Sequence, residues 1–110
     1  MEFLNNVEDF NSRRRLVDWD VNLFCKSVKL LTIAEYSTVG GHFHKEKDEL
    51  FILITGLIDE LVMGEEVKLN VVAPAAWLVK RGTYHKFYCK SSASLICLAT
   101  ETFDTNDDYK

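Results

Sequence analysis

The chain has 110 residues, of which 47% are hydrophobic and 27% are charged, and its 13 basic and 17 acidic side chains give a formal net charge of −4. A chain of this length forms one domain whose core needs neither disulfides nor a structural metal. We therefore expect residues 1–110 to be a single domain with polar ends. The acidic balance argues against the extended basic surface with which proteins bind nucleic acids, so no nucleic-acid partner is expected.

The first ten residues carry three acidic side chains and no basic one, which does not match the layout of a secretory signal. The longest near-apolar stretch, residues 50–58, is about half the length of a membrane-spanning helix. We therefore expect a cytoplasmic protein with no membrane partner. The cysteines form no CxxC pair and are odd in number, which favours reduced thiols. Those expected to be small core residues are Cys25, Cys89 and Cys97.

Short runs of β-branched and aromatic residues, separated by Gly, Ser, Asn and Asp, predict an all-β fold. In chain order, the expected strands are residues 22–26, 28–36, 49–55, 57–63, 67–71, 76–80, 85–89 and 94–100. Turns are expected at Gly40-Gly41, Met63-Gly64-Glu65 and Lys90-Ser91-Ser92. This spacing of short strands is typical of a small sandwich or barrel, which protects its strand edges by closing the sheet.

Residues 47–63 also carry leucines and isoleucines at the spacing of one amphipathic helix. The same residues alternate with a period of two, which is the pattern of a half-buried strand. Gly56 and the Ile-rich run before it argue against a continuous helix. Two strands are therefore the favoured prediction for this segment.

The three histidines of the chain, together with one carboxylate, predict a shared site. His42 and His44 form a His-x-His pair, and side chains two apart on an extended strand point to the same face. Glu49 opens the next expected strand, and His85 follows a turn that contains glycine. Three imidazoles and one carboxylate suit a divalent transition metal such as Fe, Mn, Ni or Zn. A pocket lined by histidines can also transfer protons without a metal.

The same residues show a family resemblance. The segment Gly41-His42-Phe43-His44, followed by Glu49 and Gly56, matches the first motif of the cupin superfamily. The segment Lys80-Arg81-Gly82-Thr83-Tyr84-His85 matches the second motif in part, with Lys80 where the family usually has proline. The chain therefore resembles a small cupin over about residues 28–100.

That resemblance implies a double-stranded β-barrel of jelly-roll type with its site in the mouth. It implies that the metal ligands are His42, His44, Glu49 and His85. If Glu49 and His85 point into the barrel, every second residue of 51–55 and of 85–89 points inward with them. Arg81 and Tyr84 flank His85 and are candidates to contact an anionic or hydroxylated small molecule. The candidate pocket residues are thus Phe51, Arg81, Tyr84 and Phe87.

Residues 50, 52 and 54 form an apolar face on the opposite side of the same strand, and such a face needs a cover. Cupin-like barrels commonly pair through an outer sheet, so the resemblance favours a homodimer. The N-terminal segment folding back over this face is the alternative.

Three functions agree with these residues. The first is a metal-dependent oxygenase, isomerase or lyase that acts on a small molecule. The second follows from residues 41–45 and the acidic residues 101–109, which resemble the nucleotide-sugar 3,4-ketoisomerase branch of the cupins. That branch works without metal in polysaccharide assembly, with histidines as acid and base and arginines on the diphosphate.

For this second function, Arg81 and the cluster at residues 13–15 are the candidate arginines. Glu49 departs from the branch, which generally has an uncharged amide at that position, and an acidic terminus is commonly just solvated. The third function is a small-molecule binding barrel without catalysis. Fold alone does not decide among the three.

Overall fold

The computed structural model describes residues 3–110 as strands and one short 3-10 helix. The strands are β1 (Asn6–Phe10), β2 (Arg15–Trp19), β3 (Ser27–Ile33), β4 (Ser37–His42), β5 (Glu49–Thr55), β6 (Leu57–Met63), β7 (Glu66–Val72), β8 (Ala75–Val79), β9 (His85–Cys89) and β10 (Ala93–Ala99). The 3-10 helix η1 (Thr105–Asp107) follows near the C-terminus. Within residues 3–110, no helix is long and apolar enough to span a membrane.

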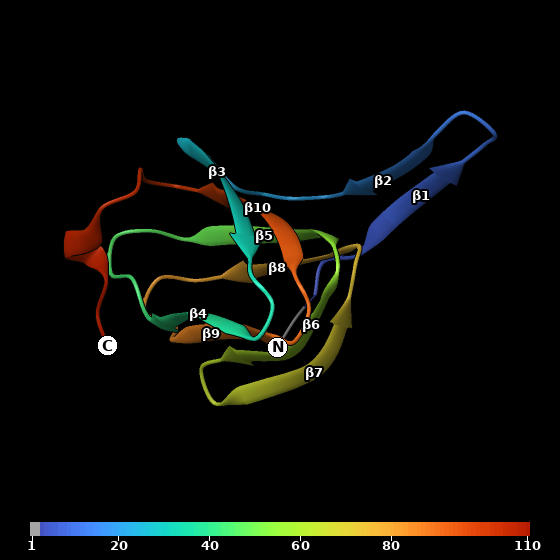
Figure 1. Cartoon of the computed structure of the whole chain (residues 1–110). Helices are drawn as coiled ribbons and strands as arrows, with labels where there is room; N and C mark the ends of the chain where they lie inside the picture. Colours follow the sequence, from blue (N-terminus) through green and yellow to red (C-terminus); the bar gives the residue numbers. More distant parts are fainter. Residues whose placement is uncertain (1–2) are drawn as a thin grey trace.

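Two antiparallel sheets of four strands form the body of the molecule (Figure 1). Their strand orders are β3-β10-β5-β8 and β4-β9-β6-β7. Consecutive strands such as β4 and β5 lie in different sheets, which is the connectivity of a double-stranded jelly roll. The all-β jelly-roll prediction is confirmed. The hairpin of β1 and β2 forms a third, separate sheet that projects away from this body.

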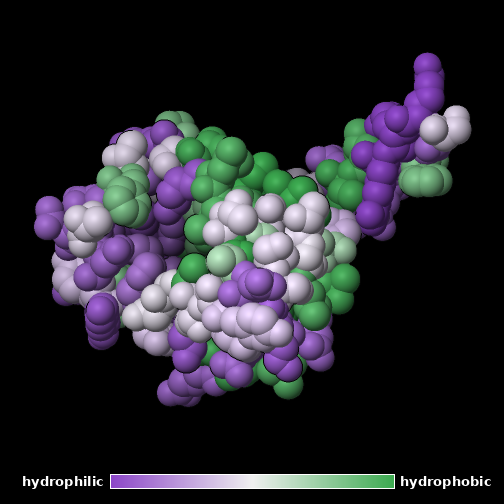
Figure 2. Space-filling view, viewed as in Figure 1, coloured by the Kyte–Doolittle hydropathy of each residue, from purple (hydrophilic) through white to green (hydrophobic). Residues whose placement is uncertain are grey.

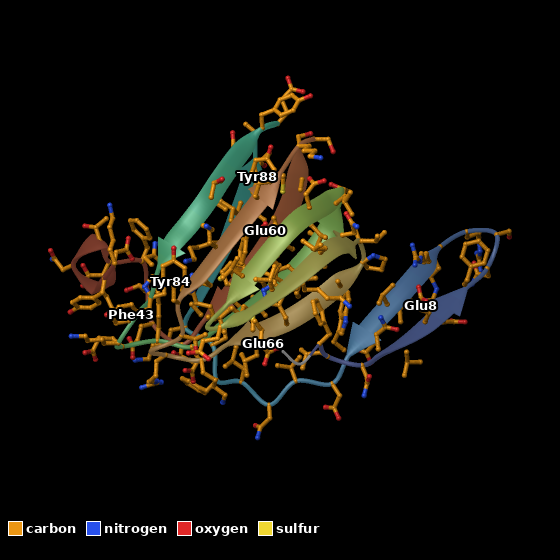
Figure 3. All side chains as sticks on the ribbon, turned by 90° about the horizontal axis from the view of Figure 1, so that it is seen from below. Glu8, Phe43, Glu60, Glu66, Tyr84 and Tyr88 are labelled. Atoms are coloured by element: carbon orange, nitrogen blue, oxygen red, sulfur yellow. The ribbon has the colours of Figure 1, made fainter. Side chains whose placement is uncertain are left out.

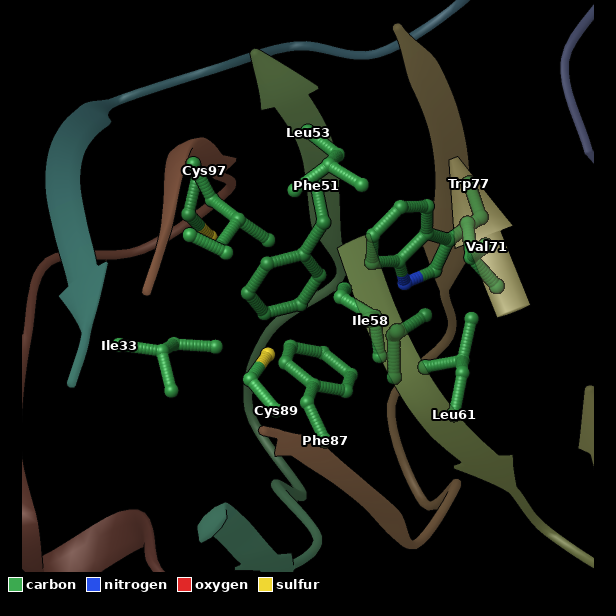
Figure 4. Packing of buried hydrophobic residues seen from close by; sticks show 13 residues of the cluster. Ile33, Phe51, Leu53, Ile58, Leu61, Val71, Trp77, Phe87, Cys89 and Cys97 are labelled. Atoms are coloured by element: carbon green, nitrogen blue, oxygen red, sulfur yellow. The ribbon is translucent and has the colours of Figure 1, made fainter. Parts of the chain in front are cut away.

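The core lies between the two sheets and is aromatic at its centre (Figure 4). The Phe51 and Phe87 rings meet edge to face with their centroids 4.9 Å apart, and Trp77 packs against both. Trp77 is fully buried, and Phe51 and Phe87 are at most 5% exposed. Burying a large apolar side chain contributes roughly 1.5–3 kcal/mol, so this cluster stabilises the contact between the sheets.

Two glycines shape strand β4, where the sequence predicted a turn and no strand. Gly40 and Gly41 have φ values of +84° and +80°, and the pairing of β4 with β9 shifts register between Gly40 and His42. A Cβ at Gly40 would lie 2.7 Å from the His85 carbonyl oxygen. The glycines therefore allow a close approach of β4 to β9 at a β-bulge, which places His42 opposite His85.

A third glycine excludes the helical alternative for residues 47–63. Gly56 has φ +97° in the tight connection between β5 and β6, and its Cβ position lies 2.8 Å from the Ser92 carbonyl oxygen. The turns predicted around Gly64 and Ser91 are confirmed.

Other predictions at the N-terminal end were wrong. Residues 22–26 are not a strand, and Cys25 is exposed rather than in the core, unlike Cys89 and Cys97. The strand predicted through residue 36 ends at Ile33, because the chain turns at Tyr36 with φ +54°. Strands β1 and β2 were missed because no residue of β1 is buried and β2 buries none fully, so neither carries the alternation that marks a half-buried strand.

Candidate functional site

A pocket of about 200 Å³ opens between the two sheets at one end of the barrel. All four predicted ligands line it: His42 ends β4, His44 follows in the loop, and Glu49 and His85 begin β5 and β9. Phe51 and Phe87 form its apolar floor. The remaining side chains on its wall include Lys29, Leu31, Val39, Lys47, Cys97, Phe103 and Asp108.

The three imidazoles converge. One ring nitrogen from each of His42, His44 and His85 lies within 4.8 Å of the other two. The ring centroids are 4.6 Å apart for His42 and His44, and 4.7 Å apart for His42 and His85. His44 and His85 are buried, whereas His42 is half-buried at the mouth. The structure therefore brings all of the histidines of the chain to one point.

Glu49 lies beneath these imidazoles and links them to a lysine. Its Oε1 atom is 3.0 Å from His44 Nε2 and 3.6 Å from His85 Nε2. Its Oε2 atom accepts a hydrogen bond from Lys29 Nζ at 2.8 Å and another from the Cys97 thiol at 3.3 Å. The carboxylate is only 2% exposed, and a buried charge of this kind requires such a cation partner.

Backbone carbonyls orient two of the rings from behind. His44 Nδ1 lies 2.8 Å from the Asp107 carbonyl oxygen, and His85 Nδ1 lies 3.1 Å from that of Thr83. A carbonyl can only accept, so each Nδ1 carries the proton and donates. Each Nε2 is consequently turned toward Glu49 and the pocket.

The environment shifts the pKa values of the histidines in opposite directions. Burial lowers the pKa of His85 to about 4, and burial together with the neighbouring His44 lowers the pKa of His42. Burial also acts to lower the pKa of His44, but the nearby Glu49 carboxylate and the hydrogen bond to the Asp107 carbonyl outweigh this effect and raise it. The site therefore favours a cationic His44 beside two neutral imidazoles.

Burial acts to raise the pKa of Glu49, but His44 and Lys29 outweigh it and hold that pKa well below its usual range. For the neighbouring Cys97, burial and the charge of Glu49 raise the pKa of the thiol. Glu49 is therefore ionised, while the Cys97 thiol stays protonated and inert at neutral pH.

The donor set fits a divalent cation. Glu49 Oε1 is buried, and although His44 Nε2 is near, no donor is aligned for a hydrogen bond to it. Three converging imidazole nitrogens, with a buried carboxylate oxygen beside two of them, are a suitable environment for a metal. His42, His44 and His85 would hold it, and Glu49 lies beside this group.

Three residues expected in the pocket lie elsewhere. Arg81 is exposed, and its Nε donates to Asp48 Oδ1 at 3.2 Å. Tyr84 does not line the pocket, and its hydroxyl oxygen lies 3.6 Å from the position that a Cβ on Gly41 would take. Thr55, predicted to point inward, is exposed because β5 runs out of the sandwich at its end.

Sequence reasoning missed the cations that do face the pocket. Lys29 lies on β3, on the same face as Leu31, which is partly buried, and Ile33, which is buried. The alternation along this strand could therefore have predicted that Lys29 faces inward. Lys47 lies in the loop before β5 and is only 2% exposed, yet within residues 3–110 its ammonium has no carboxylate partner. Nothing in the spacing of the loop predicted that Lys47 would turn inward.

Comparison with solved structures shows which fold this is. The chain superimposes on the WlaRB TDP-quinovose 3,4-ketoisomerase from Campylobacter jejuni with a TM-score of 0.82 and 19% identity, covering 98% of this chain and 90% of that one. The QdtA sugar 3,4-ketoisomerase from Thermoanaerobacterium thermosaccharolyticum in complex with TDP gives a TM-score of 0.81 and 18% identity, with 97% and 85% covered. The fold is the cupin-like jelly roll.

A third similar structure is the 4-keto-6-deoxy sugar epimerase NovW from Streptomyces spheroides, with a TM-score of 0.78 and 16% identity over 94% of this chain and 64% of that one. No protein-family model matches the chain, and no curated protein matches it in sequence. At these identities the likeness establishes the fold alone.

Proposed function

We propose that this protein is a nucleotide-sugar ketoisomerase or epimerase, which moves a proton between carbons next to the keto group of a sugar. The observation that carries the proposal is the chain of contacts from Lys29 through Glu49 to His44. It presents one oriented imidazole beside two others in a small apolar pocket. The ketoisomerase fold of the similar structures supports the same reading.

The geometry suits removal and return of a proton. For a 4-keto sugar, an imidazole without a proton on its inward nitrogen removes hydrogen from C3, and O4 gains a proton, which gives an enediol. Proton delivery to C4 and loss of the proton on O3 then complete the 3-keto sugar. His85 or His42 is the candidate base, and His44, held by Glu49, is the candidate acid. The apolar floor of Phe51 and Phe87 excludes water from the reacting carbons.

The size of the pocket indicates how such a ligand would sit. About 200 Å³ is below the usual range for sites that enclose a whole drug-sized ligand. Only the sugar would enter, so the diphosphate would remain at the mouth. We assign its recognition to Lys47, a buried ammonium with no carboxylate partner among residues 3–110, in place of the arginines expected from sequence. Arg14 and Arg15 instead pair with acidic residues on the projecting hairpin.

The test is turnover of TDP-4-keto-6-deoxyglucose by protein freed of metal with a chelator. We expect a 3-keto product, a raised melting temperature with the ligand, and a loss of about 100-fold or more in kcat for His44→Asn. Lys47→Met should raise KM, whereas Lys80→Met, at an exposed position outside the pocket, should not. No turnover and no thermal shift with several nucleotide keto-sugars would overturn the proposal.

A metal-dependent activity is the second candidate, favoured by the three converging imidazoles and by the buried Glu49 Oε1 atom beside two of them. A bound metal would polarise a carbonyl as a Lewis acid. Elemental analysis of untagged protein beside His44→Ala tests this candidate. Near-stoichiometric metal that is lost in the variant, together with turnover that requires it, would replace the metal-free mechanism.

We also propose a homodimer whose contact surface differs from the apolar face of residues 50, 52 and 54 that the sequence predicted. Leu50 is buried within the chain and Ile52 is partly buried, so of the predicted face only Ile54, at 46% exposed, lies open. Among the most exposed apolar side chains of residues 3–110 are instead Phe10 on the hairpin (77% exposed) and Leu30 on the edge strand β3 (83% exposed). Figure 2 shows the hairpin standing away from the body with apolar side chains on its surface. Sedimentation of Leu30→Lys beside the native chain tests the pairing.

A further inference from the structure

The C-terminal segment, residues 104–109, returns to the His-x-His segment and pairs with it. The Phe43 amide donates to the Tyr109 carbonyl at 2.8 Å, and the Tyr109 amide donates to the Phe43 carbonyl at 3.0 Å. The two rings stack with centroids 5.5 Å apart, and Lys45 Nζ lies 4.2 Å from the centre of the Tyr109 ring. Phe43, labelled in Figure 3, lies at the end of the barrel beside this segment.

Within this segment, Asp107 contacts both the backbone that follows His44 and the His44 ring. Its carboxylate accepts hydrogen bonds from the amides of Lys45 at 2.9 Å and Glu46 at 3.1 Å. Its own carbonyl accepts from His44 Nδ1 at 2.8 Å. The residue is 6% exposed, so these bonds are protected from water. One residue therefore holds both the backbone that follows His44 and the ring of His44.

We propose that Asp107 is a positioning residue that fixes the direction of the His44 ring. The acidic terminus is thus part of the site instead of a solvated end. The Asp107 carbonyl at 2.8 Å and the Asp108 carboxylate at 3.2 Å both face His44 Nδ1, which leaves Nε2 facing Glu49. This inference goes beyond the proposed function, because His44 needs the same orientation as a proton donor and as a metal ligand.

The carboxylate matters because it fixes the carbonyl. Without it, the amides of Lys45 and Glu46 lose their acceptors, and the remaining contacts of residues 104–109 with this loop include the Phe43–Tyr109 pairing and the contact of Asp108 Oδ1 with His44 Nδ1. The Asp107 carbonyl is then free to move away from His44. The Nδ1 proton of His44 loses its carbonyl acceptor and exchanges more readily with water.

Nitrogen-15 NMR of the imidazole rings in the full chain tests this directly. Where His44 carries protons on both ring nitrogens, the native protein should show a slowly exchanging Nδ1 proton whose resonance is shifted downfield by its hydrogen bond to the Asp107 carbonyl. Asp107→Ala should show that resonance moved upfield or lost to exchange with water. Asn106→Ala is the matched control, because the Asn106 side chain is exposed and makes none of these contacts, and it should leave the native spectrum.

A second variant keeps the test possible if Asp107→Ala does not fold. Asp107→Asn keeps an oxygen acceptor and the shape of the side chain, so a folded protein with a smaller spectral change is expected. If Asp107→Ala does not fold, the Asn variant decides. Native His44 spectra in the folded Ala variant, or in the Asn variant where the Ala variant is unfolded, would overturn the proposal. If turnover of the nucleotide keto-sugar is detected, kcat of Asp107→Ala should fall about 10-fold or more with KM little changed. If no turnover is detected, the NMR spectra still test the role of Asp107 separately from the proposed reaction.

Discussion

The pocket and the projecting hairpin use the same kind of ion pair with opposite consequences. In the hairpin, Arg14 and Asp9 are 2.9 Å apart, with both side chains at least half exposed. In the pocket, Lys29 and Glu49 are 2.8 Å apart, with side-chain exposures of 30% and 2%. An exposed pair is solvated and screened, whereas a buried carboxylate depends on its partner. Two ion pairs at similar distances therefore differ in how strongly the protein depends on them, and burial accounts for the difference.

The largest effect is expected from Glu49→Gln. The change leaves the Lys29 ammonium without its carboxylate and removes the charge beside His44. We expect a loss of about 3–5 kcal/mol in the free energy of unfolding, measured with urea at pH 7. Glu101→Gln is the matched control, because Glu101 pairs with Lys26 at the exposed surface and should cost about 1 kcal/mol or less. Equal losses in the two variants would contradict a larger contribution to stability from the buried Lys29–Glu49 pair than from the exposed pair.

The next effect concerns pH. The pKa of His85 falls from 6.5 in the unfolded chain to about 4 in the fold. Below pH 6.5 His85 binds a proton in the unfolded chain but stays neutral in the native state. The free energy of unfolding should therefore fall by about 3 kcal/mol between pH 6.5 and 4. His44, whose pKa is raised, acts with the opposite sign and loses its contribution as pH rises.

His85→Gln should therefore show a shallower loss of stability between pH 6.5 and 4 than the native chain, measured with urea at several pH values. His42, whose pKa is also lowered, retains part of the slope in this variant. An unchanged slope in the variant would mean that His85 is not the group that resists protonation.

Gly40→Ala should have a smaller effect. The substitution places a Cβ 2.7 Å from the His85 carbonyl at φ +84°, so both strain and a backbone clash oppose it. Gly82→Ala provides the control, because φ is +83° there but no atom lies within 4 Å of the Cβ position. We expect about 1 kcal/mol for Gly82→Ala and at least twice as much for Gly40→Ala in thermal unfolding. A reversed order would contradict the bulge geometry.

Arg15→Ala should have the smallest effect. Its partner Glu8, labelled on the hairpin in Figure 3, is 47% exposed, and the hairpin pairs with neither sheet of the body. We expect less than about 0.5 kcal/mol in urea unfolding. A loss as large as that of Glu49→Gln would show that the hairpin is buried in an assembly.

The alternating strands and their turn residues predicted an all-β sandwich or barrel, and the resemblance to the cupins implied the jelly roll. The His-x-His spacing placed His42 and His44 on one face, and the joint spacing with Glu49 in a chain of three histidines predicted that His85 joins them. The sequence did not predict β4, where paired glycines signal a turn by composition but adopt a bulge because β9 pairs with them. It also missed Asp107, because a contact across 63 residues leaves no periodicity to read.

Proton transfer on a keto-sugar in this pocket is tested most directly by proton NMR of TDP-4-keto-6-deoxyglucose in deuterium oxide with chelator-treated protein. We expect exchange of solvent deuterium into the carbon next to the keto group, and far slower exchange with His44→Asn. Absence of exchange with the native chain, or exchange that His44→Asn leaves unchanged, would contradict it.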